Sequence, residues 1–302
     1  MEVQNLPKPE ASSLCPNYKL IAGGKGANQA VAALRAGSEV HFTGCVGEDD
    51  FGRTLVTELA MTGVNIDGLK SVDAPTGCAA ITVNKRGENI VTVASGANLM
   101  AKSETLSDLK LKQASYLLLQ MEVNRLENFD LVNRAYDLGV PVIMNLAPFH
   151  RIPESVLKKL TYAIMNDGEA RELMQQEGAS VTTPQETATY LQETFGANII
   201  ITRAEQGLVA ATEEGLWSLK AYEIVTIDKT AAEDGFVGVF AGSLDKGLPF
   251  AEALRYGTVG GALSCETVGG QVSFPRLEAI EAVLEKIPHP ELNAYHLTKF
   301  GT

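Results

Sequence analysis

Short runs of β-branched and other apolar residues alternate with amphipathic stretches along most of the 302-residue chain. Between the runs, "RLENFDLVNRAYDLG" and "TPQETATYLQETFG" carry apolar residues at three- and four-residue steps, which is typical of helices with one buried face. Strands that alternate with crossover helices predict a doubly wound, mostly parallel α/β sheet flanked by helices, here as a single domain over residues 1–302. The expected strands are 39–46, 115–121, 140–146, 162–166 and 198–204.

The segment 77–96, "GCAAITVNKRGENIVTVASG", departs from this pattern. Its residues alternate with period two on both sides of "NKRG", a turn-forming tetrapeptide, which predicts an antiparallel hairpin. A hairpin inserted in a parallel α/β chain suits a small β lid, and we expect lid elements at about 1–22 and 76–95. The alternative is a plain edge hairpin with no role in binding.

Charge and cysteine content narrow the classes of function. The chain has 25 Lys and Arg against 37 Asp and Glu, a net charge of −12, which argues against binding to nucleic acid or to an anionic membrane. It has no apolar run of signal-peptide or membrane-spanning length, so we expect a cytoplasmic protein that acts on small molecules. The cysteines show no C-x-x-C spacing and are expected to be reduced thiols; they are Cys15, Cys45, Cys78 and Cys265.

Polar residues follow several of the expected strands. In open α/β sheets, ligands bind outside the carboxyl ends of the strands, so these positions are candidates for chemistry. Each also has a purely structural interpretation: a strand-end charge, a helix cap with a capping-box partner, or a carboxylate that complements a helix dipole. The positions are Glu122, Asn166, Glu169, Thr202, Asp228 and Asp234.

Near the N-terminus, "AGGKGANQAVAALRAG" places a glycine-rich turn directly before an alanine-rich helix. Glycines without a Cβ let another group approach the backbone, and the start of a helix directs unpaired N–H groups into the same space. A polar, oxygen-rich ligand suits this turn, although Lys25 taken alone could be a solvated loop lysine.

Two motifs carry a family resemblance. "GGKGANQAVAALRAG" resembles the first signature of the ribokinase-like (PfkB) carbohydrate kinases, and "DKTAAEDGFVGVFAG" resembles an altered copy of the second. Between and after them, "LLLQMEV", "NLAP", "NDGEAREL" and "GGQVSFP" are similar to further family segments, so the similarity covers nearly the whole chain. It implies a ribokinase-like fold and an ATP-dependent phosphotransferase with an alcohol acceptor, the primary hydroxyl of a pentose, which converts D-ribose to ribose 5-phosphate. The sequence leaves ribose, deoxyribose and nucleosides open.

The resemblance also implies residue roles. Asp234 would accept the hydroxyl proton, while Gly24, Lys25, Asn28 and Glu122 would bind the sugar. Lids in this family pair, which implies a homodimer. The residues implied near ATP are Asn166, Thr202, Gly207, Ala231, Ala232, Glu233 and Thr258; those implied for Mg²⁺, through water, are Asn166 and Glu169; those implied for potassium are Asp228, Thr230, Gly270 and Ser273.

Four features depart from the family pattern. Glu233 stands where the family has glycine, and we expect it either to repel a γ-phosphate from a strained positive-φ conformation or to point to solvent. Lys229 stands where a small hydroxyl residue is usual, and Ala204 stands where the nucleotide loop has glycine. The expected opening strand with its sugar-binding Asn and Asp is missing, so we expect an incomplete N-terminus. The alternative function is a catalytically impaired relative that binds sugar or nucleotide as a regulatory protein.

Overall fold

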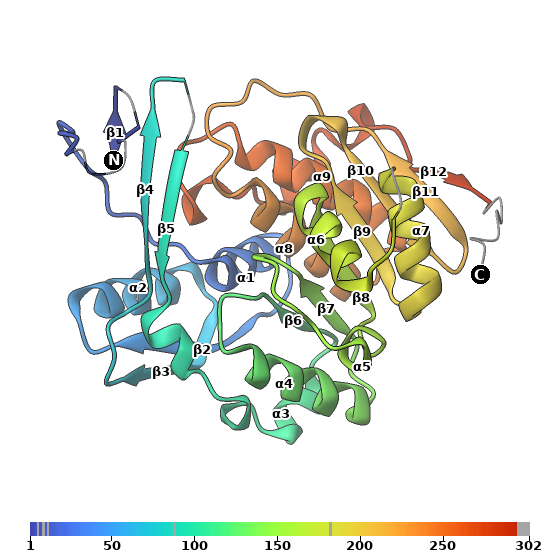
Figure 1. The fold of residues 1–302 in the computed structure, drawn as a ribbon, viewed down its shortest axis with the longest axis horizontal. Helices are drawn as coiled ribbons and strands as arrows, with labels where there is room; N and C mark the ends of the chain where they lie inside the picture. The colour runs from blue at the N-terminus through green and yellow to red at the C-terminus, as the bar shows by residue number, and fades with distance from the viewer. Residues whose placement is uncertain (5, 8–9, 11, 87–88, 181–182, 295–302) are drawn as a thin grey trace.

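A seven-stranded sheet forms the centre of the protein in the computed structural model, which describes residues 1–4, 6–7, 10, 12–86, 89–180 and 183–294 (Figure 1). Strands β6 to β9 are parallel, and β10 to β12 extend the sheet in antiparallel fashion. The predicted α/β sheet is therefore confirmed. Its strands are β6 (Leu117–Leu119), β7 (Val142–Asn145), β8 (Tyr162–Asn166), β9 (Asn198–Thr202), β10 (Leu208–Thr212), β11 (Gly215–Leu219) and β12 (Glu291–Asn293).

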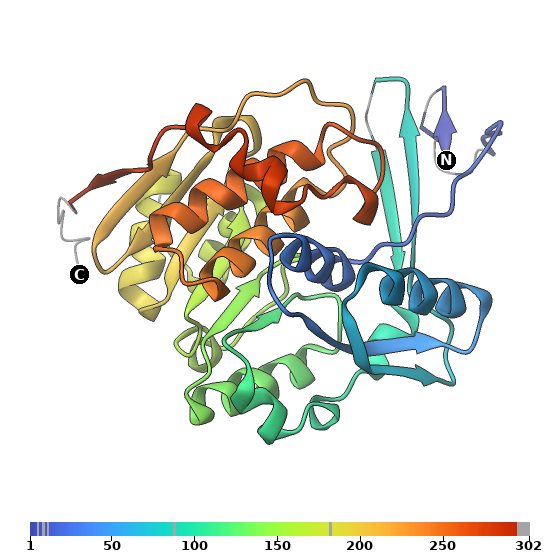
Figure 2. The same cartoon turned by 180° about the vertical axis from the view of Figure 1, so that it is seen from behind.

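Helices cover both faces of this sheet, as the two opposite views show (Figures 1 and 2). In β9, Ile199 and Ile201 pack into one buried apolar cluster and Ile200 into the other, which explains why three successive residues of the strand are apolar. One face carries α3 (Asp108–Gln113), α4 (Arg125–Leu138), α5 (Glu154–Leu157), α6 (Asp167–Glu177) and α7 (Pro184–Phe195), and the other carries α1 (Lys25–Arg35), α8 (Ala232–Asp245), α9 (Phe250–Ser264) and α10 (Leu277–Glu281).

The helix ends follow local sequence signals. Thr183 caps α7 in a capping box with Glu186, and Gly196 ends the helix in a left-handed conformation. The side chain of Asn124 caps α4, which ends at the left-handed Gly139. Both helices therefore occupy the segments that the amphipathic pattern predicts.

The predicted strand at 39–46 forms, but not in the main sheet. It is β2 (His41–Gly47), which pairs in parallel with β3 (Asn65–Val72) in a separate two-stranded sheet, and α2 (Asp50–Thr62) connects the two strands. Among the described strands, β6 ends the main sheet on this side. The expectation that all five predicted strands share one sheet is therefore wrong, because no described strand is hydrogen-bonded between β6 and β2.

The predicted hairpin is confirmed. Strand β4 (Cys78–Asn84) pairs antiparallel with β5 (Asn89–Ala94), and the short β1 (Glu2–Val3) adds in parallel to β4. This small sheet projects from the body of the molecule beside α1 (Figure 1). All four cysteines are free, as expected. In the part of the chain that the structure describes, none of the helices combines the length and apolar character that a bilayer crossing needs.

Candidate active site

The glycine turn before α1 opens onto free space. Gly24 precedes the helix with a φ of +94°, a conformation that favours glycine, and a Cβ atom on Gly23 or Gly24 would meet no atom within 4 Å. The backbone N–H of Lys25 donates to Oε2 of Glu122 at 3.2 Å, so a carboxylate from the loop after β6 lies at the positive end of α1. The turn and the Glu122 carboxylate therefore border one polar space.

Asp234 lies in the first turn of α8 and is only 5% exposed. Its Oδ2 accepts a hydrogen bond from Nδ2 of Asn28 at 2.9 Å, although the two residues are 206 positions apart. Its Oδ1 accepts a second one from Nε2 of Gln29 at 2.9 Å. Close packing of α1 on α8 makes this possible, since a Cβ on Gly238 would lie 2.4 Å from the carbonyl oxygen of Gln29.

Burial and charge act in opposite directions on the ionisable groups of this site. Burial raises the pKa of Asp234 to about 6, against the lowering effect of Lys25 and the two amide donors. Burial alone would lower the pKa of Lys25, but nearby carboxylates outweigh it and raise that pKa above its ordinary value. These carboxylates are Asp234, Glu233, Glu122 and Glu169, so one lysine stands among four acidic groups.

Glu233 points into the site rather than to solvent. Its Oε1 accepts a hydrogen bond from Nδ2 of Asn145, at the end of β7, at 2.9 Å, and its side chain is half-buried. Ala231 caps α8 and Ala232 begins it, so Glu233 has helical backbone geometry. The expectation of a strained positive-φ conformation is therefore wrong, and so is that of a solvent-facing side chain. At the start of α8 the N–H of Ala232 donates to the carbonyl oxygen of Lys229 at 3.3 Å, whereas the N–H groups of Glu233 and Asp234 have no partner among the described residues and are available to an anion.

Three amide side chains of the site were not among the residues expected from the sequence. Nε2 of Gln29 donates to Oδ1 of Asn145 at 3.1 Å as well as to Asp234, and Nε2 of Gln120 donates to Oε1 of Gln29 at 2.7 Å. They form a buried network that fixes the Asp234 carboxylate. Asn145 ends β7 and Gln120 follows β6, although both lie inside the longer predicted strands 140–146 and 115–121. An amide side chain near the carboxyl end of an otherwise apolar strand was the signal that could have found them.

Asn166 and Glu169 form the capping box that their spacing suggested. Oδ1 of Asn166 accepts from the N–H groups of Gly168 and Glu169, and Oε2 of Glu169 accepts from the N–H of Asn166 at 2.8 Å. Burial, and next the charge of Glu233, raise the pKa of Glu169 to about 7. Thr202 pairs with Asn166 across β8 and β9. A carboxylate such as that of Glu169, which the family resemblance implies for Mg²⁺, is an oxygen donor of the kind that this ion prefers.

The residues implied for potassium lie in two segments that are in contact, 228–230 before α8 and 269–273 after α9. The Asp228 carboxylate accepts hydrogen bonds from the N–H and hydroxyl of Thr230 and, at 3.0 Å, from the N–H of Gly269. Gly270 approaches Asn28, because a Cβ there would lie 3.5 Å from Oδ1 of that residue, and the hydroxyl of Ser273 donates to the Gly270 carbonyl at 2.8 Å. Within the described ranges, no group of three or more His, Cys, Asp or Glu residues could hold a metal.

The loop after β9 carries Gly207 and Ala204, two of the positions that the family resemblance places near the nucleotide. Gly207 has a φ of +83°, and Ala204 has a φ of +47°, so the backbone there adopts the left-handed conformation that the family glycine would favour. Lys229 forms an ion pair with Glu205 of the same loop. Thr258 lies on α9, and its buried hydroxyl has no hydrogen-bond partner among the described residues.

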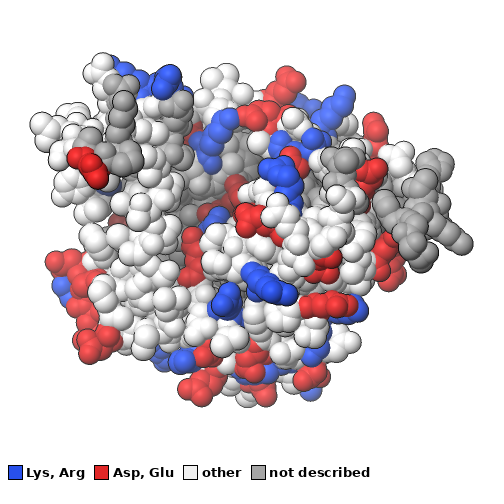
Figure 3. All heavy atoms as spheres, in the orientation of Figure 1, with Lys and Arg blue, Asp and Glu red and all other residues white. Residues whose placement is uncertain are grey.

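A cavity of about 230 Å³ joins the hairpin to this site. Figure 3 shows the same face hollowed beside the hairpin, with acidic and basic side chains around the hollow. The cavity brings Glu122 together with two residues from the hairpin and its end. It is lined by Val93, Ser95, Leu99, Met121, Glu122, Val123, Pro148 and His150.

Comparisons with known proteins decide the family. A model of the pfkB family carbohydrate kinases matches residues 1–277. The chain belongs to this family. It is 32% identical over 286 residues to ribokinase from Haemophilus influenzae, covering 93% of each chain. It is 30% identical to the crystal structure of ribokinase from Thermotoga maritima, with a TM-score of 0.87 and 94% of each chain covered. The structure of Arabidopsis thaliana ribokinase complexed with ribose and ATP matches at 25% identity with a TM-score of 0.84, also over 94% of each chain.

Membership makes this pfkB-family chain a phosphotransferase with an alcohol acceptor, a sugar kinase with a ribokinase-like fold. The catalytically impaired alternative gains no support from these relatives, which are named as ribokinases.

Proposed function

We propose that the protein transfers the γ-phosphate of ATP to the primary hydroxyl of a pentose, and that D-ribose is converted to ribose 5-phosphate. The observation that carries this proposal is the 2.9 Å contact between Asn28 and Asp234, which brings the glycine turn and the start of α8 to one point. The similarity to Arabidopsis thaliana ribokinase, whose structure is a complex with ribose and ATP, supports the choice of both substrates.

The sugar would bind over the glycine turn. Gly24 leaves room for it, Lys25 supplies a cation, and Glu122 and Asn28 supply acceptors for hydroxyl groups. Oδ1 of Asn28 is buried and has no hydrogen-bond partner among the described residues, so a sugar hydroxyl that donates to it would remove an unsatisfied group. Such contacts favour a hydroxyl-rich ligand over an apolar one.

Asp234 would take the proton from the primary hydroxyl as the oxygen attacks the γ-phosphorus in line. With its pKa raised to about 6, this carboxyl is mostly ionised at neutral pH and more basic than an exposed aspartate. Asn28 and Gln29 hold its two oxygens in place. The N–H groups of Glu233 and Asp234, which follow Ala231 and Ala232 at the start of α8, would hydrogen-bond to the transferred phosphoryl group.

The nucleotide would lie along the C-terminal half, near Asn166, Thr202, Gly207 and Thr258. Mg²⁺, when bound, neutralises phosphate charge, and Glu169 with Asn166 would hold it through water. The buried acidic character of Glu169 fits this role, because a divalent cation compensates a carboxylate that is costly to ionise alone. For potassium, Asp228 already accepts three hydrogen bonds, so backbone oxygens near Thr230, Gly270 and Ser273 would supply most ligands.

The hairpin would act as the lid of the sugar site. Val93 and Ser95 line the cavity that Glu122 also lines. Closure of the hairpin over a sugar would therefore bury the sugar and the Glu122 carboxylate together. The hairpin also exposes the apolar side chains of Ile90 and Val91, which supports pairing of two lids in a homodimer. No nucleic acid or membrane partner is proposed, and the cytoplasm is the proposed location.

The test is ATP-dependent phosphorylation by the purified protein, with D-ribose, 2-deoxyribose and adenosine as separate acceptors and with Mg²⁺ and K⁺ each present or omitted. We expect ribose to be phosphorylated with the highest kcat/KM and product analysis to give the 5-phosphate. Binding of ribose without transfer to any acceptor would contradict the proposed reaction. Faster transfer to one of the other acceptors would contradict only the choice of sugar.

A further inference from the structure

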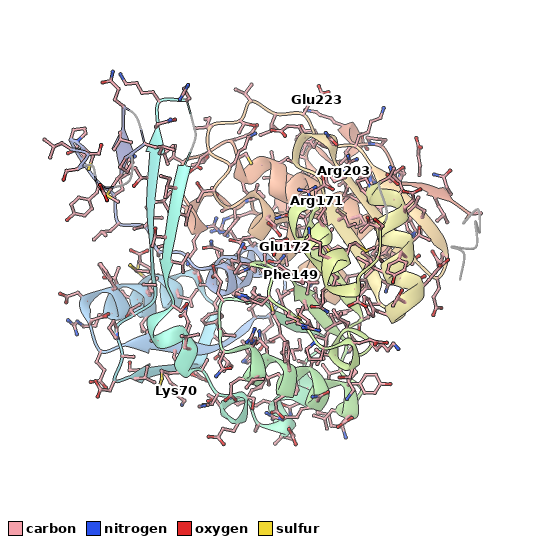
Figure 4. All side chains as sticks on the ribbon, in the orientation of Figure 1. Lys70, Phe149, Arg171, Glu172, Arg203 and Glu223 are labelled. Carbon is pink, nitrogen blue, oxygen red and sulfur yellow. The ribbon has the colours of Figure 1, made fainter. Side chains whose placement is uncertain are left out.

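Two arginines flank the start of α6, next to the proposed nucleotide residues. Arg203 follows Thr202, and its Nε lies 3.5 Å from Oδ2 of Asp167, the first residue of the helix. Arg171 folds back over the same turn, since a Cβ placed on Gly168 would lie 4.0 Å from its Nη2. In Figure 4 the labelled side chains of Arg171 and Arg203 lie next to each other, one from α6 and one from the loop after β9.

Both guanidinium groups have donors to spare. Arg171 is exposed and forms no hydrogen bond or ion pair with any residue that the structure describes. Arg203 donates from Nη2 to Gln206, while its Nε is buried and makes no hydrogen bond within the described ranges. Asp167 pairs with Arg203. The positive charge of Arg171 therefore has no carboxylate paired with it among the described residues.

The site needs positive charge in this direction. Lys25 faces the carboxylates of Glu122, Glu169, Glu233 and Asp234, so the region where a γ-phosphate must lie is acidic on balance. A polyphosphate entering it is repelled unless cations meet its other end. Guanidinium groups suit that purpose because their planar fork matches two phosphate oxygens and they remain charged at every working pH.

We propose that Arg171 and Arg203 clamp the phosphate chain of the nucleotide. This inference rests on the proposed function and extends it by two residues. The arginines and the N–H groups at the start of the eleven-residue α6 together form the anion-binding part of the nucleotide site. In this chain the clamp offsets the extra carboxylate of Glu233 and holds the nucleotide by its phosphates more than by its base.

The test compares nucleotide binding by calorimetry in the unmodified protein and in Arg171→Gln, Arg203→Gln and the double variant. Each single change is expected to weaken ADP about tenfold, as for loss of one charge-assisted hydrogen bond, and to leave the weak binding of adenosine unchanged. Inorganic tripolyphosphate should compete with ADP in the unmodified protein, and much less in the double variant. Arg53→Gln is the matched control, since Arg53 is exposed on α2 and pairs only with groups of that region.

The outcomes separate the two proposals. If the unmodified protein phosphorylates a sugar and Arg171→Gln binds ADP as tightly as Arg53→Gln does, the clamp is overturned and the kinase proposal stands. A loss of ADP and adenosine binding together would also overturn the clamp, because it would indicate general damage to the site. Arg171 is exposed and without partners among the described residues, so its substitution keeps the fold and the test remains decisive.

Discussion

Two amide side chains determine where the Asp234 carboxylate points. Asn28 and Gln29 are neighbours on α1, and each donates to a different oxygen of Asp234 at 2.9 Å. Gln29 is in turn held by Asn145 and Gln120. The carboxylate therefore has a fixed orientation before any ligand binds, and such preorganisation favours proton transfer from a correctly placed hydroxyl.

Replacing Asp234 with Asn should remove the base and retain the shape. We expect kcat to fall by about 10² to 10⁴, as for loss of a general base, with a smaller change in KM for the sugar. Steady-state kinetics with the circular dichroism spectrum as a check on folding would measure this. Asp245→Asn, at the exposed end of the same helix, is the control and should leave kcat unchanged. Equal rates for the two variants would contradict the role of Asp234.

Glu233 offers a pair of variants that separate charge from volume. Glu233→Gln keeps an acceptor for Asn145 and removes the charge, whereas Glu233→Gly removes both the charge and the side chain. Because the carboxylate faces the space that a γ-phosphate would enter, we expect both variants to lower KM for ATP and to raise kcat, with the larger gain for glycine. Each gain is expected to be about threefold to tenfold, which corresponds to about 1 kcal/mol. Slower turnover in both variants would instead show that the carboxylate assists catalysis.

At the scale of elements, the proposed nucleotide loop after β9 depends on one glycine, Gly207, for its position. A Cβ on Gly207 would lie 2.0 Å from the carbonyl oxygen of Leu219, a backbone atom of the neighbouring strand β11 that cannot move aside. The loop can therefore follow β9 closely only without a side chain at this point. Similarly, Gly238 lets α8 approach α1, and this contact brings Asp234 to Asn28.

Gly207→Ala and Gly139→Ala form a matched pair for testing this. Both residues have positive φ, but a Cβ on Gly139 would meet nothing within 4 Å. Gly139→Ala should lower the free energy of unfolding by about 1–2 kcal/mol through backbone strain alone. Gly207→Ala should lower it by about 4 kcal/mol or more and weaken nucleotide binding, since the loop must shift. Urea unfolding measures both, and equal losses would show that the contact with Leu219 is unimportant.

Local signals explain which parts of the fold could be predicted from the sequence. The caps of α4 and α7, the period-two hairpin and the capping box at Asn166 each depend on residues within a few positions of one another. The pairing of β2 depends on which strand reaches its edge, and no local pattern carries that information.

The same dependence on long-range contacts limits what the sequence could predict about the site. The motifs led to Asp234, Asn28 and Glu122, which the structure brings around Lys25. The orientation of Glu233 could not be predicted, because its partner Asn145 lies 88 residues away on another element. Gln29 is likewise tied to a partner 205 residues away. Side-chain direction in this site is decided by tertiary contacts.

At the scale of the whole molecule, the groups of the proposed active site come from both faces and from the edge of one sheet. The glycine turn and α8 approach from one face, α6 begins at the carboxyl end of β8 on the other, and the hairpin projects beside them (Figures 1 and 2). Parallel strands place all their carboxyl ends at one edge, so segments that are far apart in the chain meet there. The consequence is a group of carboxylates that the ligand-free protein must keep buried together.

This burial predicts how the stability of the ligand-free protein depends on pH. The pKa values of Asp234 and Glu169 are raised to about 6 and about 7, so between pH 4.5 and 7 the folded protein binds protons that the unfolded chain does not. The free energy of unfolding should therefore rise as the pH falls from about 7.5 to about 5. For Asp234, a rise from the ordinary 3.8 to about 6 corresponds to about 3 kcal/mol.

Below pH 4 the trend should reverse, because hydrogen bonds from Thr76 lower the pKa of Asp49 to about 2 and its protonation destabilises the fold. Urea unfolding at a series of pH values, with EDTA present and no ligand, measures the whole profile. Asp234→Asn should be more stable than the unmodified protein at pH 7.5 and nearly equal to it at pH 5, because the variant has no buried charge to neutralise at that position. A profile that falls steadily from pH 7.5 to 5 in the unmodified protein would show that these carboxyls titrate at ordinary values, and the raised basicity of the proposed base would then be lost with them.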